Sequence, residues 1–257
     1  MTPDVVLSHD NTAAIAATFR RIGQDRLDNP QRHVVVLDHC VPAASEAHAS
    51  NHQAIRAFVA EQQIENFYDV QRGICHQVLP EEGHVRPGAL ILGADSHTTT
   101  HGALGAFAAG IGRSEVAAIM AIGRLWLRVP ETIQVSVDGV LQAQVTPKDF
   151  ILRLIGDVGA DGALYQAVEF VGETIAKMAT DDRLTLCNMT AEMGAKNGYV
   201  PADDETDAWL ARRGVTGCLH VQSDPDTHYA RQIHYDITEL VPQVAAPHSV
   251  DNVAPVT

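Results

Sequence analysis

The chain lacks several features that would assign it quickly to a class of protein. Its 257 residues contain no run of about 18 apolar residues, so no segment is long enough to form a membrane-spanning helix. The N-terminal segment has no basic region followed by an apolar core, which predicts that it is not a signal peptide. The motifs of P-loop nucleotide binding, the serine nucleophile elbow and zinc proteases are absent, and the glycines at 102–112 do not match the dinucleotide fingerprint.

Cysteines and charged residues are also scarce. The four cysteines, Cys40, Cys75, Cys187 and Cys218, show no CxxC spacing, which favours free thiols in a reducing cytoplasm. Charged residues make up 19% of the chain, and 32 acidic residues against 18 basic ones give a net charge of −14. This balance argues against nucleic acid as a partner, although a few local basic groups suffice to bind a small anion. We therefore expect a cytoplasmic protein without a nucleic-acid or membrane partner.

Apolar residues make up 46% of the chain, and their pattern predicts strands alternating with helices in the first half. The spacing predicts strands at 33–37, 67–70 and 88–92, helices at 51–63 and 115–127, and a loop at 72–80. Strands that alternate with helices favour parallel pairing, because each crossover helix returns the chain to the same edge of the sheet. The expected fold class is therefore layered α/β with a mostly parallel sheet.

The pattern changes near residues 128–131, where we place a boundary between two domains. Residues 132–138 alternate strictly, and the segment after Gly139 predicts a hairpin with one wet face. Thr146 and Pro147 are typical of an N-cap and first position, so a helix is expected from Pro147 to Ile155. We expect a first α/β domain at 1–130, a second at 131–241, and a linker-like tail at 242–257.

The polar segment Gly93–Gly102 follows the apolar run at 88–92 directly. It places Asp95, Ser96 and His97 where a strand ends, and open α/β sheets build their sites at the carboxyl ends of strands. The alternative is a polar turn that caps the next helix, because turns favour Asp and Ser. The spacing alone leaves both interpretations open.

Histidine occurs 13 times, and several copies stand beside acids or amides near the ends of apolar runs. Examples are His9-Asp10, Asp38-His39 and His76-Gln77. A single histidine is more often structural than catalytic, but repeated pairs at strand ends favour acid–base chemistry.

A further polar pair lies in the segment Cys187–Glu192. Asn188 and Glu192 are four residues apart, which predicts that they share one face of a helix near its N-terminal end. A carboxyl group among Met, Ala and Gly residues is expected to be partly desolvated, which would raise its pKa and suit it to proton transfer. The alternative is a polar pair that faces solvent.

Five segments, taken in order and spacing, resemble the signature motifs of the aconitase superfamily. They are Leu37–His39, Gly73–Gln77, Gly93–Gly102, Val168–Phe170 and Cys187–Ala195. The stretch Cys75–Gly83 is most similar to large subunits of 3-isopropylmalate dehydratase, of the type close to homoaconitase. The similarity extends over about residues 5–256 and implies three-layer αβα domains with mostly parallel sheets.

The resemblance implies a hydro-lyase that removes and re-adds water on a small hydroxy di- or tricarboxylate. The substrate it favours is 3-isopropylmalate of leucine biosynthesis; the alternatives are homoaconitase and 2,3-dimethylmalate dehydratase. It also implies a [4Fe-4S] cluster that binds the substrate hydroxyl as a Lewis acid. A small subunit that carries a swivelling domain is implied as the partner, and that domain supplies a serine base.

Site residues carry over by position in the matching motifs. The resemblance implies catalytic roles for Asp38, His39, His76, Asp95, Ser96, His97 and Glu192. His76 is expected to pair with Asp95, Asp38-His39 matches the pair near the leaving hydroxyl, and Asn188 matches an asparagine beside the cluster. Ser96 and His9 are expected to bind substrate, with His9 standing where the family carries a glutamine.

The sequence departs from the family in its cysteines. None of the four matches the cluster ligands, so we expect no metal ligands in this chain and a cluster-bearing domain that lies outside it. The chain alone is then expected to be inactive. The alternative from another class is a non-catalytic fragment that lacks its cluster.

Overall fold

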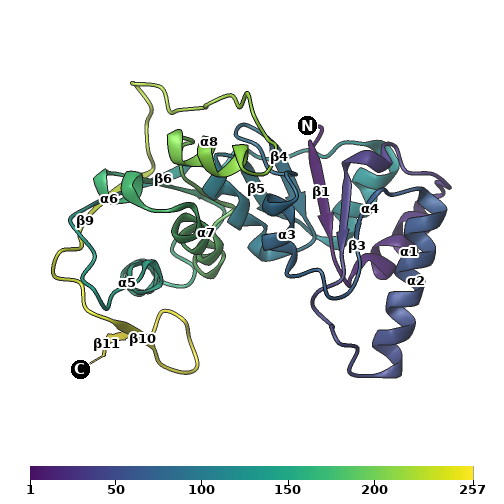
Figure 1. Cartoon of the computed structure of the whole chain (residues 1–257), viewed down its shortest axis with the longest axis horizontal. Helices are drawn as coiled ribbons and strands as arrows, with labels where there is room; N and C mark the ends of the chain where they lie inside the picture. Colours follow the sequence, from purple (N-terminus) through teal and green to yellow (C-terminus); the bar gives the residue numbers. More distant parts are fainter. Residues whose placement is uncertain (257) are drawn as a thin grey trace. The chain divides into compact units, whose positions relative to one another are not determined.

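The computed structural model describes residues 1–256 and divides into two compact units (Figure 1). The first unit contains Met1–Val85, Ala89–Thr98 and Ala109–Arg128. The second contains Arg86–Gly88, Thr99–Ala108 and the chain from Val129 onward. The units therefore interleave between residues 86 and 109, whereas a single boundary near residue 130 was expected. The reason is that the segment after the Asp-Ser-His motif packs with the second sheet, which no local pattern indicates.

The first unit is built on a parallel sheet with the strand order β3-β2-β1-β4-β5. β1 pairs in parallel with β2 on one side and β4 on the other, and β2 pairs in parallel with β3. The central strands are buried on both faces, as expected of a sheet covered by helices on both sides. The strands are β1 (Val5–Ser8), β2 (His33–Val36), β3 (Asn66–Tyr68), β4 (Leu90–Gly93) and β5 (Phe107–Gly110).

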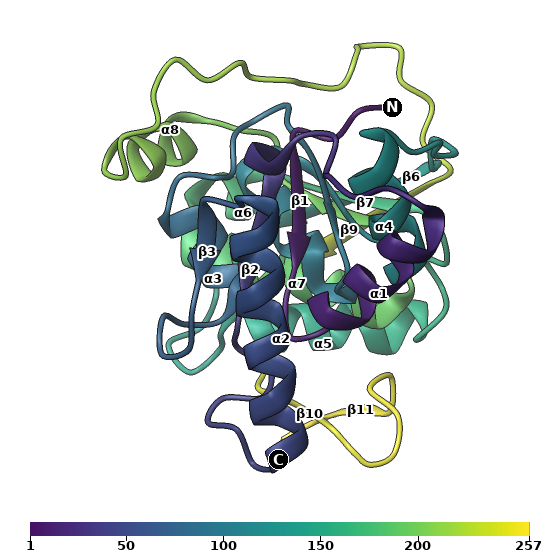
Figure 2. The same ribbon diagram turned by 90° about the vertical axis from the view of Figure 1, so that its right-hand side faces the viewer.

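Helices cover both faces of this sheet and confirm the layered α/β class. The helices α1 (Thr12–Ile22), α2 (Glu46–Gln62) and α4 (Arg113–Ile122) lie on one face, where α1 contacts both of the others (Figure 2). Helix α3 (Cys75–Glu81) lies on the other face and contacts β2. Two 3₁₀ helices, η1 (Pro30–Arg32) and η2 (Ser96–Leu104), complete the short elements.

The expectation of a loop at 72–80 is wrong, because most of that segment forms α3. A helix of seven residues is too short to show a clear period in the sequence, and Pro80 is typical of a loop. The helix forms because Cys75, Val78 and Leu79 are buried, and because the backbone N–H of Cys75 donates to Asp38 Oδ2 at 2.7 Å.

The second unit is built on a second parallel sheet with the order β8-β7-β6-β9. Its strands are β6 (Thr132–Asp138), β7 (Ala167–Val171), β8 (Asn197–Tyr199) and β9 (Arg231–Asp236). β6 alternates buried and half-buried residues as expected, but it pairs in parallel with β7 and β9. The predicted hairpin after Gly139 is therefore wrong, since both partners of β6 are remote in sequence.

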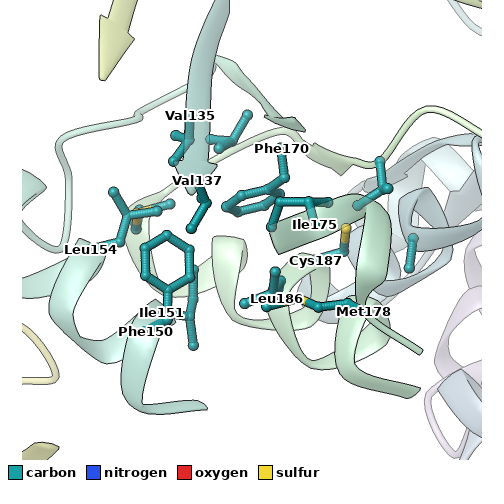
Figure 3. Packing of buried hydrophobic residues seen from close by; sticks show 14 of the residues in the cluster. Val135, Val137, Phe150, Ile151, Leu154, Phe170, Ile175, Met178, Leu186 and Cys187 are labelled. Carbon is teal, nitrogen blue, oxygen red and sulfur yellow. The ribbon is translucent and has the colours of Figure 1, made fainter. Parts of the chain in front are cut away.

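One apolar face of this sheet packs against α5 (Pro147–Val158), α6 (Glu173–Lys177) and α7 (Thr180–Met189). Figure 3 shows Val135 and Val137 of β6 and Phe170 of β7 meeting Phe150 and Leu154 of α5. The helix predicted from Pro147 is confirmed, and Asp149 accepts hydrogen bonds from the Thr146 backbone N–H and hydroxyl. The 3₁₀ helix η3 (Thr190–Met193) and α8 (Asp204–Ala211) complete the helices.

The C-terminal segment differs from the linker-like tail expected at 242–257. Strands β10 (Gln243–Ala245) and β11 (Val253–Pro255) form an antiparallel pair. The backbone N–H of Gln243 donates to Asp149 Oδ1 at 2.8 Å, and that of Ala160 donates to Asp251 Oδ2 at 3.1 Å. These bonds attach the segment to α5 although its Pro- and Ala-rich composition is typical of a linker. None of the helices in residues 1–256 is long and apolar enough to cross a membrane.

Candidate active site at the carboxyl edge of the first sheet

The chain order of the first sheet creates a switch point between β1 and β4. From β1 the chain moves outward to β2 and β3, and then returns to the other side of β1 as β4. Open α/β sheets bind their ligands outside the carboxyl ends of strands at such a point. His9 follows β1, Asp38 and His39 follow β2, and Asp95 follows β4. Residues from three distant segments therefore meet at one edge of the sheet.

The carboxylate of Asp95 is the centre of this cluster. Its Oδ1 lies 2.8 Å from His76 Nε2 and accepts a 2.8 Å bond from the His97 backbone N–H. Its Oδ2 lies 3.1 Å from His39 Nε2 and 3.7 Å from His9 Nε2. The expected pairing of His76 with Asp95 is therefore confirmed.

The environment holds Asp95 ionised. Burial alone would raise its pKa, but the hydrogen bond and charge of His76, with the His97 N–H and His9, hold it well below its usual range. A permanent carboxylate shared by several imidazoles fixes the orientation of their rings.

His39 lies between two carboxylates. Its Nδ1 is 2.6 Å from Asp38 Oδ1, and its Nε2 is 3.1 Å from Asp95 Oδ2. Burial would lower the pKa of His39, but the hydrogen bond and charge of Asp38, followed by those of Asp95, raise it above its ordinary value. The side chain is 41% exposed, so a proton on this ring is accessible to a ligand. His39 is thus suited to act as a general acid.

The ring of His9 stacks on that of His39, with 3.8 Å between the centroids. Burial lowers the pKa of His9, and the positive charge of His39 lowers it further. Two stacked imidazoles thus have pKa values displaced in opposite directions. Such a separation favours one neutral ring and one charged ring, as in acid–base sites generally.

Ser96 and His97 lie at the start of η2, where Ser96 Oγ is 3.3 Å from His97 Nδ1. The turn that presents them requires glycine opposite. A Cβ on Gly110 would lie 2.7 Å from the Asp95 carbonyl oxygen and 3.0 Å from Ser96 Cα, so no other residue fits without displacing the motif. Of the nine expected site residues, the structure brings seven together here: His9, Asp38, His39, His76, Asp95, Ser96 and His97.

Asn188 and Glu192 belong to the second unit. Asn188 lies in the last turn of α7 and Glu192 in η3, so the expectation that both lie near a helix N-terminus is wrong. The i,i+4 spacing fitted one helix, but the α-helix ends at Met189. Asn188 Nδ2 donates to Thr100 Oγ1 at 2.9 Å, and its carbonyl accepts a 3.3 Å bond from Thr99 Oγ1. These bonds link α7 to the segment that follows the Asp-Ser-His motif.

Sequence reasoning missed Asp10 as a site residue. Its Oδ2 accepts hydrogen bonds from the backbone N–H groups of Asp38 and His39 at 2.9 and 2.8 Å. The signal available was its place in the pair His9-Asp10 at the end of an apolar strand. The side chain contacts two backbone amides and the ring of His52, which lies 42 residues away, so no residue pattern indicated its role.

One group of side chains has the composition of a metal site. Ligating atoms of His9, Asp10, Asp38 and His39 all lie within 4.8 Å of one another. However, Asp10 already accepts from two backbone amides and faces His52, and Asp38 Oδ1 and His39 Nδ1 face each other at 2.6 Å. These hydrogen bonds explain why the four side chains lie close together without a metal ion.

The cysteines do not fit an iron–sulfur cluster. Among residues 1–256, no group of three or more candidate metal ligands contains a cysteine. Cys75 and Cys187 are buried, and burial raises the pKa of both thiols, which disfavours the thiolate that a cluster needs. The described residues therefore do not supply a ligand set for a [4Fe-4S] cluster.

The structure is that of an α/β protein with a group of histidines and carboxylates at the switch point of a parallel sheet. The model of the aconitase family (aconitate hydratase) matches residues 1–257. The chain belongs to the aconitase family.

The curated relatives carry more specific names. A large subunit 1 of 3-isopropylmalate dehydratase from Methanopyrus kandleri is 51% identical over 98% of this chain and 61% of its own length. A probable 3-isopropylmalate dehydratase large subunit from Methanothermobacter thermautotrophicus is 52% identical over 99% of this chain and 61% of its own length. A probable methanogen homoaconitase large subunit from Methanosarcina mazei is 47% identical over 98% of this chain and 65% of its own length. The chain thus spans about three fifths of the length of these relatives.

Among solved structures, the aconitase X of Thermococcus kodakaraensis (holo-form) is similar in fold, with a TM-score of 0.52. It is 14% identical in sequence, and the similarity covers 93% of this chain and 58% of that one. At this identity the likeness supports the aconitase-like fold alone.

Proposed function

We propose that this chain forms part of the large subunit of a hydro-lyase that acts on a small hydroxy di- or tricarboxylate. The observation that carries the proposal is His39, an exposed imidazole between Asp38 and Asp95 with a raised pKa. Hydroxide is a poor leaving group, so dehydration needs a protonated group beside it. Family membership and relatives named as dehydratases support the same reaction class.

In this proposal His39 donates a proton to the departing hydroxyl, and Asp38 holds its ring through Nδ1. Asp95 orients the rings of His39 and His76, and the proton on carbon passes to the serine base of the proposed swivelling domain. Ser96 and His9 bind the substrate, and His97, which lies beside Ser96 at the start of η2, belongs to the acid–base set. Glu192 of the second unit is proposed as a further catalytic residue.

The family implies a [4Fe-4S] cluster that acts as a Lewis acid on the substrate hydroxyl, but the described residues do not fit it. We therefore assign the cluster ligands to parts of the assembly outside this chain, which spans only 61–65% of the length of the relatives. Asn188 is proposed to lie beside that cluster. Because the relatives are named large subunits, we propose a small subunit with a swivelling domain as the partner and the cytoplasm as the location.

We propose 3-isopropylmalate as the substrate, which would place the reaction in leucine biosynthesis. Two 3-isopropylmalate dehydratase large subunits, at 51% and 52% identity, support this choice over the homoaconitase large subunit at 47%. Homoaconitase remains the second candidate because that difference is small. The third is 2,3-dimethylmalate dehydratase.

The test compares the 257-residue chain with a complete assembly that also contains the remaining large-subunit sequence and a small subunit. After anaerobic reconstitution, the chain alone should show neither cluster absorption nor turnover, while the assembly should convert 3-isopropylmalate. His39→Asn should abolish turnover in the assembly. His84→Gln is the control, because His84 pairs with Tyr68 in the same unit and lies outside the group of histidines and carboxylates around Asp95.

Two results would contradict the proposal. One is a wild-type assembly that has a bound cluster but converts no hydroxy acid of this class. The other is a His39→Asn assembly that is as active as the wild type.

A further inference from the structure

The turn that presents Asp38 and His39 is held by a buried carboxylate. Asp10 follows β1 and is 8% exposed, and its Oδ2 accepts bonds from the backbone N–H groups of Asp38 and His39 at 2.9 and 2.8 Å. A single oxygen thus fixes two successive peptide groups of the turn. Charge-assisted bonds of this kind are stronger than bonds between neutral groups.

The other oxygen of Asp10 is held from helix α2. His52 Nε2 lies 2.6 Å from Asp10 Oδ1, and the His52 side chain is only 4% exposed. The neighbouring Asn51 donates from Nδ2 to the backbone carbonyl of Asp10 at 2.7 Å. Two successive residues of α2 therefore fix the carboxylate and the backbone of Asp10.

The contacts of Asp10 with His52 and Asn51 add to the two bonds by which Asp10 holds the turn. A buried carboxylate costs desolvation free energy, which its hydrogen bonds must offset. Burial would by itself raise the pKa of Asp10, but the bonds from His52 and the two backbone amides lower it below the ordinary value. Asp10 therefore stays ionised, and its charge lies next to the backbone of Asp38 and His39, the residues proposed for proton transfer.

We propose that Asp10 and His52 form a positioning pair that holds the Asp38–His39 turn, and through it the His39 ring, in the geometry needed for proton transfer. The catalytic consequence rests on the proposed function; the structural link does not. Displacement of a catalytic group by about 1 Å can cost about a hundredfold in rate. The pair would thus affect the reaction without contacting the substrate.

The first experiment measures the link without using activity. Amide hydrogen exchange, followed by NMR on the 257-residue chain, should show slow exchange for the N–H groups of Asp38 and His39. Asp10→Ala should accelerate both, because their acceptor is removed, while Asp10→Asn should retain part of the protection through its side-chain oxygen. His84→Leu is the matched control, since it removes a 2.6 Å bond to Tyr68 in the same unit and should leave both amides protected.

The second experiment measures turnover in the complete assembly with 3-isopropylmalate. His52→Leu should lower kcat by about tenfold to a hundredfold with KM changed less than threefold. His52→Gln should recover most of this loss, because its amide can still donate to Asp10. His84→Leu should lower Tm to a similar extent but leave kcat unchanged, which separates positioning from a loss of stability.

The outcomes distinguish the two proposals. Equal exchange of the Asp38 and His39 amides in the wild-type, Asp10→Ala and Asp10→Asn chains would overturn the positioning role whatever the activity. So would an active wild-type assembly whose kcat is unaffected by His52→Leu. A wild-type assembly without turnover, combined with the expected exchange pattern, would overturn the proposed function and leave the structural link established.

Discussion

The two units are built on similar parallel sheets but use their buried polar groups differently. In the first unit, Asp95 faces the rings of His9, His39 and His76 at the carboxyl edge. In the second, the buried carboxylate of Glu169 accepts a 2.9 Å bond from the Ser223 hydroxyl and a 3.4 Å bond from the Gln134 amide. One carboxylate is shared by imidazole rings, and the other contacts a hydroxyl and an amide.

The second unit also buries an arginine among partners that include no histidine. Arg183 is fully buried, and its guanidinium bonds to both oxygens of Asp203 at 2.7 Å and to the carbonyls of Met178 and Ala176. All of these partners are structural and none is a histidine. Burial of a charge therefore does not by itself mark a site, whereas several titratable groups around one carboxylate do.

The largest expected effect comes from removing the charge of Asp95. Asp95→Asn should lower kcat of the complete assembly by about 10²–10⁴-fold, because His39 loses a carboxylate that raises its pKa and His76 loses the carboxylate that orients its ring. Glu169→Gln is the matched variant in the second unit and should leave kcat within about threefold. Steady-state kinetics with 3-isopropylmalate measures both variants. Equal losses in kcat would contradict the view that only the carboxylate of the first unit takes part in the reaction.

Arg183→Met tests the buried ion pair of the second unit against a surface pair of the first. It should lower the free energy of unfolding by about 3 kcal/mol, because the carbonyls of Met178 and Ala176 and the partly exposed carboxylate of Asp203 lose a fully buried donor. Arg20→Met removes an exposed pair with Glu61, whose N–O distance is 2.6 Å, and should cost less than about 1 kcal/mol. Urea denaturation followed by circular dichroism compares the two. Similar losses would show that the difference in burial has no effect.

Acid pH should destabilise the first unit through His33. Burial, together with the charge of Arg32, lowers the pKa of His33 from 6.5 to about 4. The unfolded chain therefore takes up a proton at higher pH than the folded one, so stability is lost as the pH falls from 6.5 to about 4. The difference corresponds to about 3 kcal/mol.

His33→Gln removes this titration, so its free energy of unfolding should fall less over the same pH range. Urea denaturation at a series of pH values measures the effect. Parallel curves for the wild-type and variant chains would exclude His33 as the source.

The smallest effects are expected at two helix N-termini, one in each unit. Ser45 Oγ accepts from the His48 N–H at 3.2 Å at the start of α2, and Ser45→Ala should cost about 1 kcal/mol. Asp149→Ala should cost about 1–2 kcal/mol, because Asp149 also accepts from the Gln243 N–H and so holds the C-terminal hairpin. Thermal unfolding measures both variants, and hydrogen exchange at Gln243 should increase only in Asp149→Ala.

Most of the fold could be predicted where local patterns are strong. The runs of β2 and β4, the alternation of β6 and the cap at Thr146 each correspond to an observed element. The failures share one cause. Helix α3, the parallel partners of β6 and the hairpin of β10 and β11 all depend on contacts with residues remote in sequence.

The sequence predicted some residues of the candidate site and missed others. The sequence indicated Asp38, His39, His76 and Asp95 because titratable residues follow apolar strands there. It did not indicate Asp10 and His52, because their role depends on one carboxylate meeting two backbone amides and a helix 42 residues away. No residue pattern records such a contact.

By itself, the sequence determined the parallel α/β class and the family, because periodicity and motif spacing are local properties, and it indicated candidate site residues. The tertiary structure alone decided which of those residues meet. The return of the chain to β4 beside β1 brings Asp95 to within 3.1 Å of His39. The opposite displacement of the His9 and His39 pKa values follows from that meeting, since burial and neighbouring charge act through distance in space and not along the chain.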